Sequence, residues 1–103
     1  MAHALEVAEG IRYQSSDERL PYQITTTVLV SDPTSPTLVA YDENDGADVT
    51  STVYPTNSPS ATGDVITLSL LRDLTVGHTY RIEVQFLVGS SIYECFFRVK
   101  CER

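Results

Sequence analysis

Few side chains in this 103-residue sequence could carry nucleophilic chemistry. The sequence has two histidines, His3 and His78, and two cysteines, Cys95 and Cys101. A catalytic Ser or Cys needs a base within hydrogen-bond reach. Both cysteines fall in one strand-like run, whereas His78 falls in a turn-like segment where we expect a solvated side chain. We therefore predict no Cys–His pair, no catalytic residue and a protein that is not an enzyme.

An acidic turn that begins at Asp42 is the one candidate for a metal site. Its candidate ligands are Asp42, Asn44 and Asp48, because calcium prefers carboxylate and amide oxygens on a loop. An EF-hand loop starting there would need Gly at its sixth position and Glu at its twelfth, but the chain has Ala47 and Val53. We favour a solvated hairpin turn, with a looser calcium site as the alternative. No phosphate-binding glycine loop or Cys/His metal spacing occurs, so we expect no cofactor.

The two cysteines lie six residues apart in what reads as one strand. A straight strand would hold them about 20 Å apart, and a disulfide needs Cα atoms within about 7 Å. An even separation places both on one face of the strand. We predict reduced thiols in the core, with a disulfide to a neighbouring subunit through Cys101 as the alternative.

The charge is strongly negative, with seven Lys and Arg against 14 Asp and Glu and a formal net charge of −7. Such a chain repels phosphate backbones and anionic lipid, so nucleic acid and membrane surfaces are poor partners. The opening residues lack the basic start and unbroken apolar run of a signal peptide. No stretch approaches the roughly 20 apolar residues of a membrane span. We expect a chain that stays in the cytoplasm where it is made, unless it leaves by lysis or in a larger particle.

The elements that must position these residues are strands. Residues 93–101 and 80–88 alternate apolar and polar side chains, and Gly89-Ser90-Ser91 between them predicts a hairpin with a loop of about three residues. Turn-rich stretches recur at intervals of about ten residues, a spacing typical of one sandwich or barrel domain. Further β-rich runs are residues 24–30, 37–41, 49–54 and 66–71, and the expected loops are 32–36, 42–48 and 55–63.

The first part of the chain lacks this alternation. Gly10 and the polar residues 14–19 favour an extended N-terminal arm over a helix. We divide the chain into an arm, residues 1–22, and a β-sandwich domain, residues 23–103.

Apolar residues on the solvent side of two strands indicate a candidate interface. Leu87 and Phe96 are expected to face outward, and we interpret them as cross-strand neighbours. Such residues mark a surface for a partner, or the protein's own arm covers them. The full candidate interface adds three residues of the arm and reads Tyr13, Leu20, Tyr22, Leu87 and Phe96.

The most specific local motif is Leu74-Thr75-Val76-Gly77-His78-Thr79-Tyr80, between two predicted strands. It resembles the tyrosine corner of fibronectin type III and related sandwiches, with Val76 in place of the usual Pro. The resemblance implies that Leu74, Gly77 and Tyr80 fix the fold, with the Tyr80 hydroxyl bonded to backbone just upstream.

A second resemblance spans about residues 24–100. It consists of segments in a fixed order: an acidic turn, Val49-Thr50-Ser51-Thr52-Val53, a Pro/Ser loop, a strand, Leu-Thr-x-Gly-x-x-Tyr and a closing hairpin. The order is similar to small immunoglobulin-like virion proteins of tailed phages and prophages, including fibre-tail adaptors and capsid decoration proteins. The resemblance implies an all-β, antiparallel immunoglobulin-like or fibronectin III-like sandwich.

The same resemblance implies a structural role in the head or tail of a virion assembled in the host cytoplasm. The partners would then be protein subunits present in multiple copies. The alternative is a carbohydrate-binding or adhesion module of a larger surface protein. Such a module would use exposed aromatic side chains, for which the candidates are Tyr13, Tyr22, Tyr41 and Tyr54.

Overall fold

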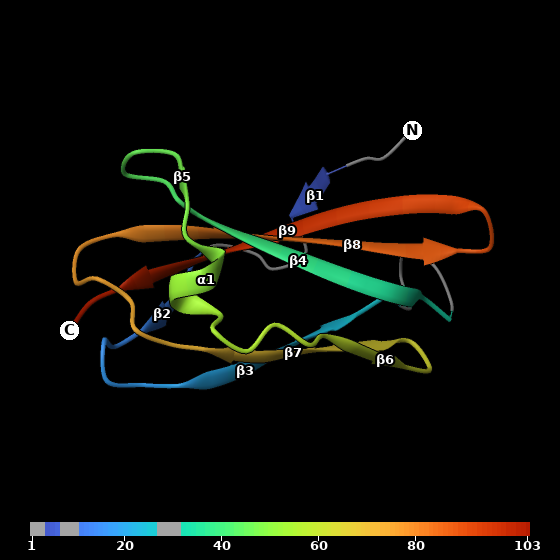
Figure 1. Ribbon diagram of the computed structural model, residues 1–103, viewed down its shortest axis with the longest axis horizontal. Coiled ribbons are helices and arrows are strands. Elements are labelled where there is room, and N and C mark those ends of the chain that lie inside the picture. The colour runs from blue at the N-terminus through green and yellow to red at the C-terminus, as the bar shows by residue number, and fades with distance from the viewer. Residues whose placement is uncertain (1–3, 7–10, 27–31) are drawn as a thin grey trace.

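β-strands dominate the computed structural model, which describes residues 4–6, 11–26 and 32–103 (Figure 1). The described residues hold one short helix, and the all-β prediction is confirmed. In chain order the elements are β1 (Ala4–Glu6), β2 (Arg12–Gln14), β3 (Leu20–Thr25), β4 (Thr34–Asp42), β5 (Ala47–Asp48), α1 (Thr50–Val53), β6 (Ser60–Thr62), β7 (Val65–Leu71), β8 (Thr79–Val88) and β9 (Ser91–Cys101).

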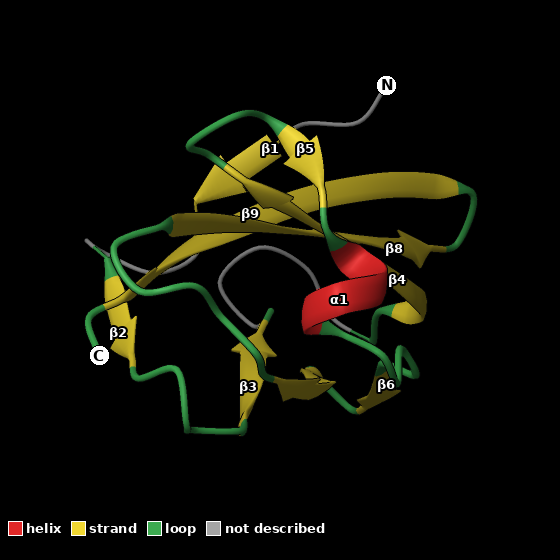
Figure 2. Cartoon of the chain, turned by 60° about the vertical axis from the view of Figure 1, so that its left-hand side comes forward, coloured by secondary structure: helices red, strands yellow, loops and turns green. Residues whose placement is uncertain are grey.

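The strands form two sheets that lie one above the other (Figures 1 and 2). The larger sheet has the order β1-β9-β8-β4-β5, with β2 also paired to β9, and the smaller sheet has the order β3-β7-β6. The pairings of β1 and β2 with β9 are parallel, and the other pairings are antiparallel. The antiparallel pairing expected of the sandwich thus holds for β3 to β9, and the N-terminal arm adds two short strands that run in the same direction as β9.

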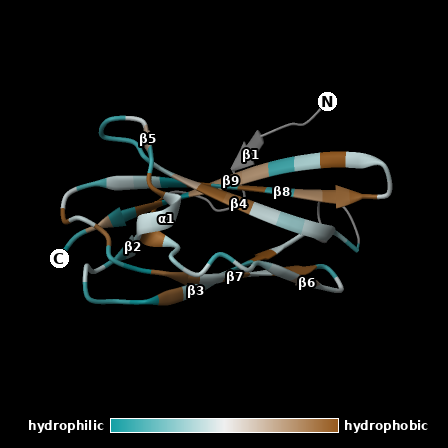
Figure 3. Ribbon diagram, viewed as in Figure 1, coloured by the Kyte–Doolittle hydropathy of each residue, from teal (hydrophilic) through white to brown (hydrophobic). Residues whose placement is uncertain are grey.

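Buried apolar residues from strands of both sheets form the core. Hydrophobic positions recur along these strands (Figure 3). Burial of this apolar surface drives folding at about 25 cal/mol per Å². Cys95 and Cys101 are fully buried and do not bond to each other, so their predicted place in the core is confirmed, while their reduced state stays a prediction. The fully buried core side chains include Ile66, Leu71, Ile82, Val84, Phe86, Cys95, Val99 and Cys101.

Two hairpins have a glycine with a positive φ in their turns. The β8–β9 hairpin is confirmed, but its loop has two residues, since Val88 pairs directly with Ser91. Gly89 takes a φ of 60°, a left-handed conformation that Gly adopts without steric cost. The acidic turn is likewise a hairpin, between β4 and β5, with Gly46 at a φ of 75°.

The β-rich run 49–54 contains a short helix at Thr50–Val53 instead of a strand, which corrects the sequence interpretation. Asp48 Oδ1 accepts hydrogen bonds from the Thr50 N–H at 3.0 Å and the Thr50 hydroxyl at 2.7 Å, and these local bonds favour a turn over a strand. The turn becomes α1, which with the residue after it buries Val53 and Tyr54 against the core.

Other boundaries differ by a few residues. The expected loop 55–63 contains β6, and the expected loop 32–36 contains the first residues of β4. The strand expected at 24–30 is β3, which begins at Leu20, and residues 27–30 lie outside the described part of the chain. Nowhere do the described residues form a helix long and apolar enough to cross a membrane.

Candidate functional site

The N-terminal segment adds to the free edge of β9 in two short pieces. Leu5 of β1 pairs with Cys95, and Tyr13 of β2 pairs with Lys100. Glu6 pairs with Phe96 and Arg12 pairs with Val99. Five residues separate Glu6 from Arg12, whereas two separate their partners on β9, so the two pieces do not form one continuous strand. The expected arm therefore meets the domain as edge strands, and Leu20 and Tyr22 from its last residues lie in β3.

Gln14 fixes the second of these pieces between the two sheets. Its side chain is buried, and its Nε2 donates to the carbonyl of Leu71 at 2.8 Å and of Glu18 at 3.0 Å. Its Oε1 accepts a hydrogen bond from the Tyr22 hydroxyl at 3.0 Å. Its backbone carbonyl accepts from the Glu102 N–H at 3.2 Å. All the polar groups of this side chain are used, as buried amides require.

Tyr22 joins this arrangement to the core. Its ring lies 5.2 Å from that of Phe97, measured between centroids. Burial, and then the nearby charge of Glu18, raises the pKa of the Tyr22 hydroxyl above its ordinary value. The hydroxyl stays protonated and donates to Gln14, so Tyr22 is a structural side chain at this junction.

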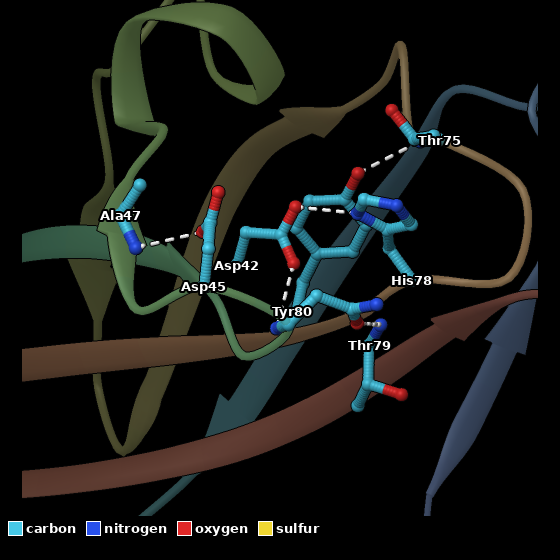
Figure 4. Close-up of polar contacts among 8 residues, drawn as sticks. Asp42, Asp45, Ala47, Thr75, His78, Thr79 and Tyr80 are labelled. Carbon is cyan, nitrogen blue, oxygen red and sulfur yellow. Dashed lines mark hydrogen bonds and ion pairs between the residues drawn. The ribbon is translucent and has the colours of Figure 1, made fainter.

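The candidate corner lies between β7 and β8 (Figure 4). The Tyr80 hydroxyl accepts a hydrogen bond from the Thr75 N–H at 2.7 Å, which is the upstream backbone contact that the motif predicts. Gly77 has a φ of 87°, a region that favours Gly, and its N–H donates to the Cys101 carbonyl at 2.8 Å. Leu74 is buried in the core.

His78 lies in the loop before β8, as expected, but its side chain is only partly exposed and is paired with Asp42. Its Nδ1 lies 2.6 Å from Asp42 Oδ2, and its ring lies 6.5 Å from that of Tyr80 (Figure 4). The Asp42 carboxylate is buried and also accepts from the Asn44 N–H at 3.0 Å. An Asp–His pair orients the base in catalytic triads, but among the described residues no hydroxyl or thiol forms a hydrogen bond with the His78 ring. The pair joins the β4–β5 hairpin to the corner.

The weak calcium candidates accept hydrogen bonds from the backbone, Asp42 and Asp48 within their own turns and Asn44 from β8. Asn44 Oδ1 accepts from the Thr79 N–H at 3.4 Å, and Asp42 and Asp48 accept the bonds described above. The Thr50 hydroxyl, and then the Thr50 N–H, lowers the pKa of Asp48. Within residues 4–6, 11–26 and 32–103, no group of three or more His, Cys, Asp or Glu could hold a metal ion.

The two outward apolar residues of the predicted interface do not meet. Leu87 pairs with Ile92, and Phe96 pairs with Glu83 four rungs away, so their interpretation as cross-strand neighbours is wrong. Even with the three-residue loop that the sequence predicts, Leu87 would pair with Tyr93, so the positions of the two residues in a short hairpin keep them apart. Both side chains are half-buried, and the Arg81 guanidinium lies 3.7 Å from the centroid of the Phe96 ring.

The tyrosines proposed for sugar binding do not form one exposed set. Tyr13 is 59% exposed, Tyr22 and Tyr41 are half-buried, and Tyr54 is buried. Burial raises the pKa of Tyr54 well above its ordinary value, with a smaller contribution from Tyr22. An aromatic platform needs several exposed rings, so this arrangement gives the carbohydrate alternative little support.

Sequence reasoning missed Gln14 and the Asp42–His78 pair. The partners of the Gln14 amide nitrogen are backbone carbonyls, which carry no residue-type signal. Asp42 and His78 are 36 positions apart, and each occurs in a segment that reads as a solvated turn. No protein-family model, curated protein or solved structure matches the chain.

Proposed function

We propose that this chain is a non-enzymatic structural protein that joins repeated subunits within a larger assembly. It does so by adding its N-terminal strand to a neighbouring subunit. The observation that carries the proposal is the parallel pairing of β1 with the edge of β9. Strand addition satisfies backbone N–H and C=O groups whichever copy supplies the strand. The same bonds that β1 makes within its own chain can therefore link one copy to the next.

The two pieces of the arm have different roles in this proposal. β2 is held by the buried Gln14 side chain and by the Glu102 N–H, so each domain keeps its own β2. β1 is three residues long and pairs with three residues of β9. A pairing this short stabilises by only a few hydrogen bonds of about 1 kcal/mol each, so its exchange between copies costs little.

For the fold we propose an immunoglobulin-like sandwich. The order β9-β8-β4-β5 corresponds to strands G-F-C-C′ of that fold, and β3-β7-β6 corresponds to B-E-D. The Tyr80 corner at the start of β8 takes the place of the tyrosine corner at strand F. Together with the resemblance of residues 24–100, this supports a subunit of the head or tail of a phage or phage-like particle.

A cysteine at position 5 tests the exchange of β1, because Leu5 pairs with the native Cys95. Neighbouring strands lie about 4.8 Å apart, within the Cα range of about 4.4–6.8 Å for a disulfide. We expect Leu5→Cys, refolded in a glutathione buffer in a Cys101→Ala background, to give disulfide-linked oligomers on a non-reducing gel. The share of linked oligomers should rise with protein concentration.

The matched control is the same variant with Cys95→Ala, which should give no ladder of linked oligomers. A disulfide that stays within the monomer at every concentration contradicts the proposal. The particle itself is tested by the genes beside the one that encodes this chain. Head or tail genes support it, and an enclosing hydrolase gene supports the carbohydrate-binding alternative.

A further inference from the structure

Among the described strands, the outer edge of β3 differs from the sheet edges formed by β5 and β6. β5 is two residues long and includes Asp48, and β6 is three residues long. β3 has six residues, none of them charged, and no described strand pairs with its outer edge. Proteins usually protect such edges with charges, short strands or covering segments. Pro21, which lacks an N–H, is the one edge-protecting residue in this strand.

The backbone groups on this edge have known directions. The Thr26 N–H donates to the Asp64 carbonyl at 2.8 Å, on the side where β7 lies. N–H and C=O groups alternate in direction along a strand. Ile24 therefore directs its groups toward β7, whereas Gln23 and Thr25 direct theirs away from it, to the open edge.

We propose that β3 pairs with β3 of a second copy of this chain, antiparallel, about a twofold axis at Ile24. In that register Gln23 of one copy lies opposite Thr25 of the other. Each such pair exchanges two hydrogen bonds, N–H to C=O in both directions, and the axis generates the second pair. The two three-stranded sheets become one sheet of six strands.

The side chains of the edge fit this pairing. Gln23 and Thr25 are exposed and neutral, so no like charges meet across the axis despite the net charge of −7. Ile24 points into its own core and is 3% exposed. The contact is thus made mainly by backbone, and self-complementarity identifies a second copy as the occupant. β1 lies on the other sheet, so the pairing does not depend on the exchange of β1.

Sedimentation velocity on the full chain, up to millimolar concentration, tests the pairing. We expect a concentration-dependent dimer in the wild-type chain. Thr25→Pro removes the outward N–H without touching a bond to β7, and two lost hydrogen bonds should raise the dimer Kd about tenfold or more. Thr25→Val keeps the N–H and is the matched control, which should dimerise like the wild type.

A pair of charge variants decides the question independently of proline. Gln23→Lys with Thr25→Lys places like charges opposite each other and should weaken the dimer. Gln23→Lys with Thr25→Glu places opposite charges there and should restore it. A wild-type chain that remains monomeric overturns the proposal. So does a wild-type dimer whose Kd is unchanged by Thr25→Pro in a folded protein, or whose Kd is unchanged by Gln23→Lys with Thr25→Lys. Because Leu5→Cys reports β1 alone, failure here is distinct from failure of the proposed function.

Discussion

At the scale of single residues, Gln14 has the largest structural consequence. One buried amide contacts β3, β7 and the turn at Glu18, so it holds the N-terminal segment on both sheets at once. A buried polar group is stabilising only while all its partners are present.

Gln14→Glu is therefore expected to lower the free energy of unfolding by about 2–4 kcal/mol. The carboxylate would replace a donor and face the carbonyls of Leu71 and Glu18, both acceptors. Urea denaturation measures the loss. Gln23→Glu, the same change on the exposed face of β3, is the control and should alter stability by less than about 0.5 kcal/mol. Equal effects of the two changes would refute the role given to Gln14.

At the scale of elements, the corner fixes the path from β7 into β8. Its hydrogen bond joins residues five positions apart, so a local motif was enough to predict it. The Asp42–His78 contact stabilises the same region but joins separate elements, and no local pattern predicts it.

Removing the hydroxyl in Tyr80→Phe should cost about 1 kcal/mol, because the Thr75 N–H loses its acceptor. The ring still packs in the core, so the fold should persist, and thermal melting should report a lowered Tm. Tyr13→Phe changes an exposed tyrosine and should leave the Tm unchanged. If Tyr80→Phe and Tyr13→Phe have the same Tm, the hydrogen bond of the corner has no stabilising role.

At the scale of the whole molecule, buried acidic groups couple stability to alkaline pH. Burial, and then Glu94, raises the pKa of the Cys95 thiol from 9.0 to about 12. Burial also raises the pKa of the Tyr22 and Tyr54 hydroxyls. These groups are neutral in the folded chain and lose their protons first in the unfolded chain. The stabilisation is thus complete below pH 9 and is lost as the pH rises toward 12.

We expect the free energy of unfolding to fall between pH 9 and pH 12, by up to about 1.4 kcal/mol per pH unit from Cys95. Denaturation curves at a series of pH values measure this slope. Cys95→Ala should reduce the slope while lowering stability at neutral pH, since it leaves a cavity in the core. A slope that does not change in this variant would contradict the assignment to Cys95.

The sequence determined the strands whose side chains alternate, and with them the core. β7, β8 and β9 each repeat apolar residues at a period of two, and Gly89 and Gly46 mark the turns of two hairpins. These are local properties, because burial of one strand face and the backbone freedom of Gly act within a few residues.

Only the tertiary structure decided the features that depend on which segments meet. The pairing of β8 with β9 sets Leu87 four rungs from Phe96, and the bonds of Asp48 turned a β-rich run into α1. Gln14 finds its partners on strands far from it in sequence, and β1 pairs with the edge that β9 leaves open. Backbone hydrogen bonds are the same for every residue type except proline, so the sequence has no local signal for which edge the N-terminal segment joins.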